Sequence, residues 1–133
     1  MNWYIFSAGA LVIIAFFVHA VVGDKEFRLL RPETEGGNTR ENDVWIQTRS
    51  GWHWVSVDLL LTGIALLLIA STDIISAKRE ISFLLFLYYL VTGITWLITV
   101  LLNKANNNQI LVIGQWIFCF IVSGLTYIGW SQL

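Results

Sequence analysis

Two histidines, and the charged residues near them, are the strongest candidates for chemistry in this chain. His19 and His53 are the only histidines among the 133 residues. Asp24 and Glu26 follow the first histidine, and Arg49 precedes the second by four residues, which is about one helical turn. Two imidazoles and a carboxylate form a known ligand set for zinc and non-haem iron. The residue types therefore predict a metal site made of His19, His53, Asp24 and Glu26.

Other interpretations of the same residues stay open. Asp58 could supply the oxygen ligand in place of the other carboxylates. Both histidines could instead hold one haem b, but bulky side chains such as Trp52 crowd the predicted place. A third interpretation is structural, in which His19 and His53 pair with carboxylates and with Arg49 and so lock two helices together. Histidine spacing without a HExxH-type signature favours this third interpretation over metal, and metal over haem.

Asp58 is a separate candidate, because it is the one charge in an apolar stretch that runs from Trp54 to Thr72. It lies about one helical turn beyond Trp54, and Thr62 shares its face at a spacing of four residues. A lone carboxylate inside a membrane is expected to be protonated or paired. Asp58 is therefore expected to have a partner.

The elements that must position these residues are long apolar segments. The chain is 56% hydrophobic and 13% charged, with a mean hydropathy of +0.69, whereas a soluble domain has about a quarter charged residues. No Asp, Glu, Lys or Arg occurs in three stretches, which are Met1–Gly23, Ile81–Asn103 and Ala105–Leu133. Each reaches the ~20 residues that span a bilayer. Together with the Asp58 segment they predict an all-α protein that crosses a membrane four times.

The predicted helices cover about 2–30, 43–72, 80–102 and 109–130, with a polar loop at about 32–42. Pro32 should end the first helix, and Asn42 or Asp43 can cap the second. Short connections favour antiparallel neighbours, so the expected fold is one up-down-up-down four-helix bundle. The first segment begins without Lys or Arg and is expected to be a retained helix rather than a cleaved signal peptide.

The lysines and arginines predict an orientation in the membrane. Six of them flank the first and third segments on the side of the long loop, whereas two, Lys78 and Arg79, lie in the turn on the other side. Loops rich in Lys and Arg stay in the cytoplasm. We therefore expect a multi-pass protein of the inner, cytoplasmic membrane, with both termini outside the cytoplasm.

Several of these residues also carry a resemblance to a family. The motifs are His19-Ala-Val-Val-Gly23-Asp24, then Arg28-Leu-Leu-Arg31-Pro32, then Arg49-Ser-Gly-Trp52-His53. They resemble a family of small, uncharacterised, four-helix bacterial inner-membrane proteins with the patterns H-x3-G-E, L-x-P and R-x2-W-H. Asp24 replaces the usual glutamate of that family. The resemblance covers about the first half of the chain and implies no substrate, but it does imply that these motif residues form one unit.

The sequence favours binding over catalysis, because it shows no nucleophile–base pair, phosphate-binding loop or cofactor fingerprint. The expected function is therefore a small membrane protein with a His/carboxylate/Arg cluster at one interface, which could bind a metal ion. One alternative is a carrier of small solutes or protons that acts as a homo-oligomer. Another is a metal-dependent or bis-His haem oxidoreductase of the membrane. No basic cluster suited to nucleic acid is present, and the expected partner is the lipid bilayer.

Overall fold

A computed structural model describes residues 1–32, 40–102 and 114–133, and these residues form helices and short connections without any strand. The helices in chain order are α1 (Trp3–Phe17), η1 (Val18–Gly23), α2 (Asp24–Leu29), α3 (Arg40–Ser71), α4 (Lys78–Leu102) and α6 (Gln115–Trp130). The first three are consecutive and act as one helix of 27 residues. This helix, α3 and α4 are long and apolar enough to cross a membrane, and α6 is a shorter apolar helix.

The helix boundaries agree with the sequence prediction for the first element and differ at the starts of the others. α3 begins at Arg40 rather than at residue 43, with Glu41 and Asp43 in its first turn, where acidic side chains favour a helix N-terminus. α4 begins at Lys78, two residues earlier than expected. Residues 33–39 of the expected polar loop lie outside the described part of the chain.

The predicted fourth helix, 109–130, is described by the structure only from residue 114 onward. Residues 109–113 lie outside the described residues, and Gly114 adopts a turn conformation with φ −80° and ψ 19°. The helix that reaches Trp130 therefore begins at Gln115. Glycine has a low helix propensity because it loses the most backbone freedom on folding, which explains an end at this position.

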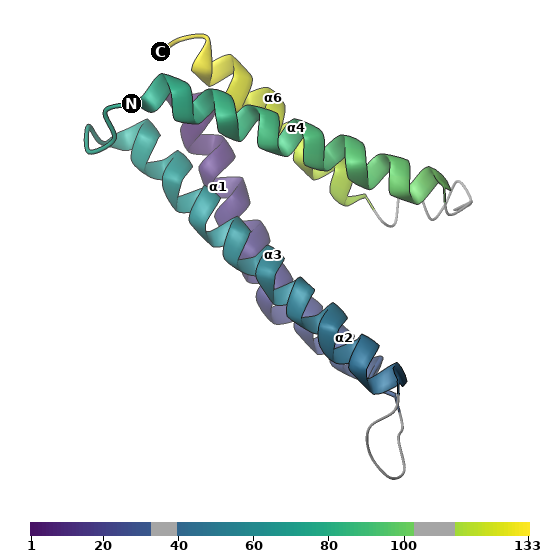
Figure 1. The fold of residues 1–133 in the computed structure, drawn as a ribbon. Helices are drawn as coiled ribbons and strands as arrows, with labels where there is room; N and C mark the ends of the chain where they lie inside the picture. Colours follow the sequence, from purple (N-terminus) through teal and green to yellow (C-terminus); the bar gives the residue numbers. More distant parts are fainter. Residues whose placement is uncertain (33–39, 103–113) are drawn as a thin grey trace.

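The helices form two antiparallel pairs that meet at the end of the molecule where both termini lie (Figure 1). α1 packs along α3, and α4 packs along α6, while α1 also contacts α6. Gly9 faces Leu67 of α3, and Gly93 of α4 faces Cys119 and Phe120 of α6, so the backbones approach closely in both pairs. α3 and α4 follow each other in the chain, yet they diverge and their backbones are close at few places.

The core lies where the two pairs meet. Fully or almost fully buried apolar side chains from four helices gather there, namely Ile5, Ala8, Val12, Leu66, Ile69, Tyr89 and Val122. Toward the other end, η1 and α2 pack against each other, with η1 also against α1 and both against α3. That end must therefore be held together by its own side chains.

Asn2 connects three helices at the end where the termini lie. Its side-chain oxygen accepts a hydrogen bond from the Ile5 N–H at 3.2 Å and so caps α1. Its side-chain nitrogen donates to the carbonyl of Gly129 in α6 at 2.8 Å. Its backbone N–H donates to the carbonyl of Ala70 in α3 at 3.1 Å. One asparagine therefore caps α1 and links it to both neighbours.

Replacing Asn2 separates these roles. We expect Asn2→Ala to lower the free energy of unfolding by about 1–2 kcal/mol, because the cap and the bond to Gly129 are both lost. Asn2→Asp should lose about half as much, since its oxygen still caps α1 but no N–H remains for Gly129. Thermal unfolding in detergent measures both, with Gln132→Ala as an exposed control. A melting temperature of Asn2→Ala equal to that of the wild type would contradict this assignment.

Candidate functional site

Asp24 is the centre of the cluster, and the fold buries it at the junction of η1 and α2. It is the first residue of α2, and only 5% of its surface is exposed. Arg28, one turn later in the same helix, approaches Asp24 Oδ2 with Nη2 at 2.6 Å and donates from Nε at 2.8 Å. A guanidinium that contacts a carboxylate through two nitrogens is a strong, directional ion pair.

α3 supplies two further partners for the same carboxylate. Arg49 donates from Nε to Asp24 Oδ1 at 3.0 Å and from Nη2 to Oδ2 at 3.4 Å. His53 Nε2 lies 3.2 Å from Asp24 Oδ1. The predicted meeting of Asp24, Arg49 and His53 is therefore confirmed, and it fastens α2 to α3.

The Trp45 ring of α3 packs against two arginines beside the cluster. The Trp45 ring lies under two guanidinium groups, with Arg49 Cζ at 5.4 Å and Arg31 Cζ at 5.5 Å from its centroid. Its indole N–H donates to the carbonyl of Phe27 at 3.3 Å. Cation–π contacts of this kind hold a guanidinium in place without neutralising its charge.

His19 belongs to the same interface but has different partners. Its ring stacks on Trp52 with a centroid distance of 3.8 Å and an interplanar angle of 8°. Its Nδ1 lies 2.9 Å from the Ser56 hydroxyl, and its carbonyl accepts the Trp52 indole N–H at 3.0 Å. The carbonyl belongs to the π-helical segment η1, where the backbone hydrogen bonds depart from the α pattern, as is common at functional sites.

Gly23 makes room for this stack. A Cβ atom on Gly23 would overlap the six-membered ring of Trp52. The two helices therefore approach closely at Gly23, and Trp52 is the side chain that occupies the space. The position of Trp52 in turn sets the position of the His19 ring.

The residues predicted to hold a metal do not converge on one point. His53 and Asp24 are in contact, but His19 bonds to Ser56, and Glu26 is exposed to solvent. Among the described residues, no group of three His, Cys, Asp or Glu side chains is placed to hold a metal ion. A haem shared by both histidines would need Nε2 of His19 and Nδ1 of His53, because Nδ1 of His19 lies against Ser56 and Nε2 of His53 lies against Asp24. The donor set therefore fits an ion-paired cluster better than either cofactor.

Asp58 lies apart from this cluster. The Tyr88 hydroxyl of α4 donates to Asp58 Oδ2 at 3.5 Å, a long hydrogen bond. Thr62, one turn later in α3, donates to the Asp58 carbonyl at 2.7 Å, and its hydroxyl lies 2.6 Å from the Tyr89 hydroxyl. The expected partner of Asp58 is thus a tyrosine of the other helix pair rather than a histidine.

Sequence reasoning missed three members of the site. The spacing of Asp24 and Arg28, four residues apart on a helix, was a usable signal for their ion pair. No local signal marked Ser56 as the partner of His19, or Trp45 as the ring between two arginines. Those two contacts depend on how far α3 is rotated about its own axis.

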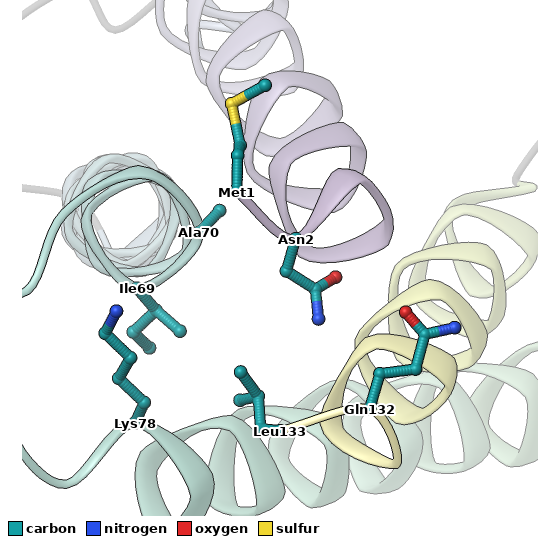
Figure 2. A pocket seen from close by; sticks show the side chains of 7 residues that line it. All are labelled: Met1, Asn2, Ile69, Ala70, Lys78, Gln132 and Leu133. Atoms are coloured by element: carbon teal, nitrogen blue, oxygen red, sulfur yellow. The ribbon is translucent and has the colours of Figure 1, made fainter.

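A pocket lies at the opposite end of the molecule, beside the chain termini. It has a volume of about 300 Å3 and lies among Met1, Asn2, Ile69, Ala70, Lys78, Gln132 and Leu133 (Figure 2). The Lys78 ammonium pairs with Asp73 at 2.7 Å, and this bond lowers the pKa of the Asp73 carboxyl. The amide of Asn2 is already used in capping and linking helices. Two of the polar side chains that line this pocket, those of Lys78 and Asn2, are therefore already bonded.

Comparison with known proteins adds no relative whose chemistry could be set beside this geometry. The resemblance of the first half of the chain to a bacterial inner-membrane family stays a prediction from its motifs. No protein-family model, no curated protein and no solved structure matches this chain.

Proposed function

We propose that this chain is an integral protein of the cytoplasmic membrane that crosses the bilayer four times, up-down-up-down, with both termini outside the cytoplasm. Three helices long and apolar enough to span support the proposal. α6 alone rises about 24 Å, less than the ~30 Å of hydrocarbon. The sequence before it, Ile110 to Ile113, is apolar and extends the fourth segment.

The helix lengths support a position of the cluster at a membrane boundary. From Trp3 to Asp24 the helix rises about 32 Å, close to the thickness of the hydrocarbon core. The 32 residues of α3 rise about 48 Å, so this helix extends beyond that core. Under the proposed orientation, Asp24 and its partners lie at the cytoplasmic edge.

The cluster carries positive charge that Asp24 does not neutralise. From Asp24 to Arg31 and from Trp45 to His53, four basic side chains face two acidic ones, which leaves +2 with His53 neutral. The side chain of Arg28 is 64% exposed, that of His53 is 47% exposed and that of Arg49 is 30% exposed. The buried carboxylate thus orients the cationic groups while much of their surface stays open. A positive surrounding disfavours a metal cation and favours an anion.

The site is therefore proposed to bind the phosphate of an anionic lipid headgroup. Arginine forks match phosphate oxygens in geometry, and juxtamembrane Lys and Arg attract anionic lipids by about 1 kcal/mol each. The observation that carries the proposal is the single buried carboxylate that holds Arg28, Arg49 and His53 at this level. Free phosphate shares the chemistry, but the position at the lipid boundary favours the headgroup.

Native mass spectrometry of the purified protein tests the proposal. After exchange into mixed phosphatidylcholine and phosphatidylglycerol, we expect the protein to retain phosphatidylglycerol preferentially. Arg28→Gln combined with Arg31→Gln should abolish the preference, because two guanidinium groups that could meet the phosphate are lost. Arg79→Gln, which removes a cation at the other end of the molecule, should leave it unchanged.

Two results would overturn the proposal. One is equal retention of both lipids by the wild type. The other is displacement of the retained lipid by millimolar inorganic phosphate, which would assign the site to the free anion instead.

A further inference from the structure

We infer that Asp58 is the anchor of a second binding site, one that takes an organic cation with apolar substituents between α3 and α4. The site is distinct from the Asp24 cluster, because Asp58 lies nine residues, or about 14 Å, from Arg49 along α3. It does not depend on the proposed lipid site.

The depth of Asp58 is the first argument. Its partner Tyr88 lies ten residues after Lys78, the start of α4, which is a rise of about 15 Å. On α3, Asp58 lies five residues, or about 7.5 Å, beyond His53 at the proposed cytoplasmic edge, so under the proposed topology it lies inside the ~30 Å hydrocarbon core. A carboxylate at this level is costly and marks a functional position unless a partner compensates it.

The partners of Asp58 do not compensate a negative charge. Its side chain accepts one long hydrogen bond from Tyr88, and the four ion pairs among the described residues involve Asp24 and Asp73 instead. A second copy of the chain could not supply the cation, because no Lys or Arg occurs in Trp54–Thr72 or Ile81–Asn103. No basic side chain among the described residues pairs with Asp58, so a cationic ligand is the partner that we infer for its ionised form.

Aromatic rings beside the carboxylate indicate which cations fit. Trp54 precedes Asp58 by four residues, so both lie on one face of α3, and 72% of the Trp54 surface is exposed. Tyr88 is 42% exposed on α4. Indole and phenol faces attract cations, most strongly when the cation is poorly hydrated. A carboxylate flanked by Trp and Tyr suits an organic ammonium or phosphonium better than a metal ion.

The face of α3 around Asp58 is only partly covered in the described part of the chain. α3 and α4 diverge there (Figure 1). A Cβ on Gly51, which shares the Asp58 face, would meet no atom within 4 Å, and Leu61 is 60% exposed. Gly51 and Leu61 on this face of α3 are therefore not covered by other described residues.

Isothermal titration with tetraphenylphosphonium in phosphatidylcholine nanodiscs tests the inference. We expect saturable binding to the wild type, weakened about tenfold or more in Asp58→Asn, which keeps the shape of the side chain but removes its charge. Trp54→Leu should weaken it about threefold or more, and because the Trp54 side chain is largely exposed, its loss removes little packing within the protein. Asp73→Asn, a matched loss of one carboxylate at a helix end, should bind like the wild type.

The neutral analogue triphenylphosphine oxide separates binding from partition into lipid. It should show no saturable binding to any variant. Equal affinity of the wild type and Asp58→Asn for the phosphonium, or saturable binding of the neutral analogue to the wild type, would overturn the inference. Tyr88→Phe keeps the ring and loses the hydroxyl, so it should retain most of the binding.

Discussion

Asp24→Asn is expected to lower the melting temperature of the detergent-solubilised protein by at least about 5 °C. Asparagine keeps the size of the side chain but removes the charge that holds Arg28, Arg49 and His53. Arg49, whose side chain is 30% exposed, then loses its carboxylate partner, and a partly buried charge without a partner is more costly than a missing contact. Thermal unfolding followed by tryptophan fluorescence measures the change.

Glu26→Gln is the matched control, since it removes a carboxylate two residues later that is exposed. It should unfold like the wild type. Arg49→Gln should destabilise the protein as well, and the double variant with Asp24→Asn should cost clearly less than both single changes added together, because each breaks the same ion pair. Additive effects would show that the two residues do not act as one unit.

Gly23→Ala is expected to destabilise the protein by about 1–3 kcal/mol, although alanine is the better helix former. The new methyl group would overlap the Trp52 ring, which is rigid and also stacks on His19. Relieving the overlap must move the ring or separate the two helices. Denaturation in a mixed detergent with sodium dodecyl sulfate measures the loss.

Gly51→Ala is the control within the same helix pair. A Cβ at Gly51 meets no atom within 4 Å, so the substitution should stabilise α3 by about 0.5–1 kcal/mol. Combining Gly23→Ala with Trp52→Leu should relieve part of the clash, so that the double variant loses less than the sum of its parts. Destabilisation by Gly51→Ala equal to that by Gly23→Ala would contradict the close packing at Gly23.

The sequence by itself determined which segments are helices that can span a membrane. Uncharged stretches of about 20 residues have few other folded states, because backbone polar groups in an apolar setting must be satisfied within the helix. The starts of α3 and α4 lie within three residues of the predicted positions. The start of α6 could not be predicted from hydropathy, because Gly114 interrupts a stretch that is apolar on both sides.

The sequence also predicted which residues of the cluster lie at the same level along the helix axes. Antiparallel helices with a fixed rise per residue place Asp24 opposite Arg49 and His53, whatever the details of packing. The choice of partners was decided only by tertiary structure. His19 turns to Ser56 rather than to a carboxylate, and Glu26 faces solvent. Rotating a helix by one residue turns it by about 100°, and sequence spacing does not report that rotation between two helices.

The arrangement of the two pairs likewise required the tertiary structure. Chain order favoured α3 and α4 as close neighbours, whereas α3 packs on α1, and α4 packs on α6. Glycine-lined contacts such as Gly9 on Leu67 and Gly93 on Cys119 draw the backbones together within each pair. Between apolar helices, such close packing, rather than hydrophobicity, selects the partner, because every lipid-facing surface is equally apolar. Because each helix packs on its own partner, α3 and α4 diverge (Figure 1). Hydropathy alone cannot predict this divergence.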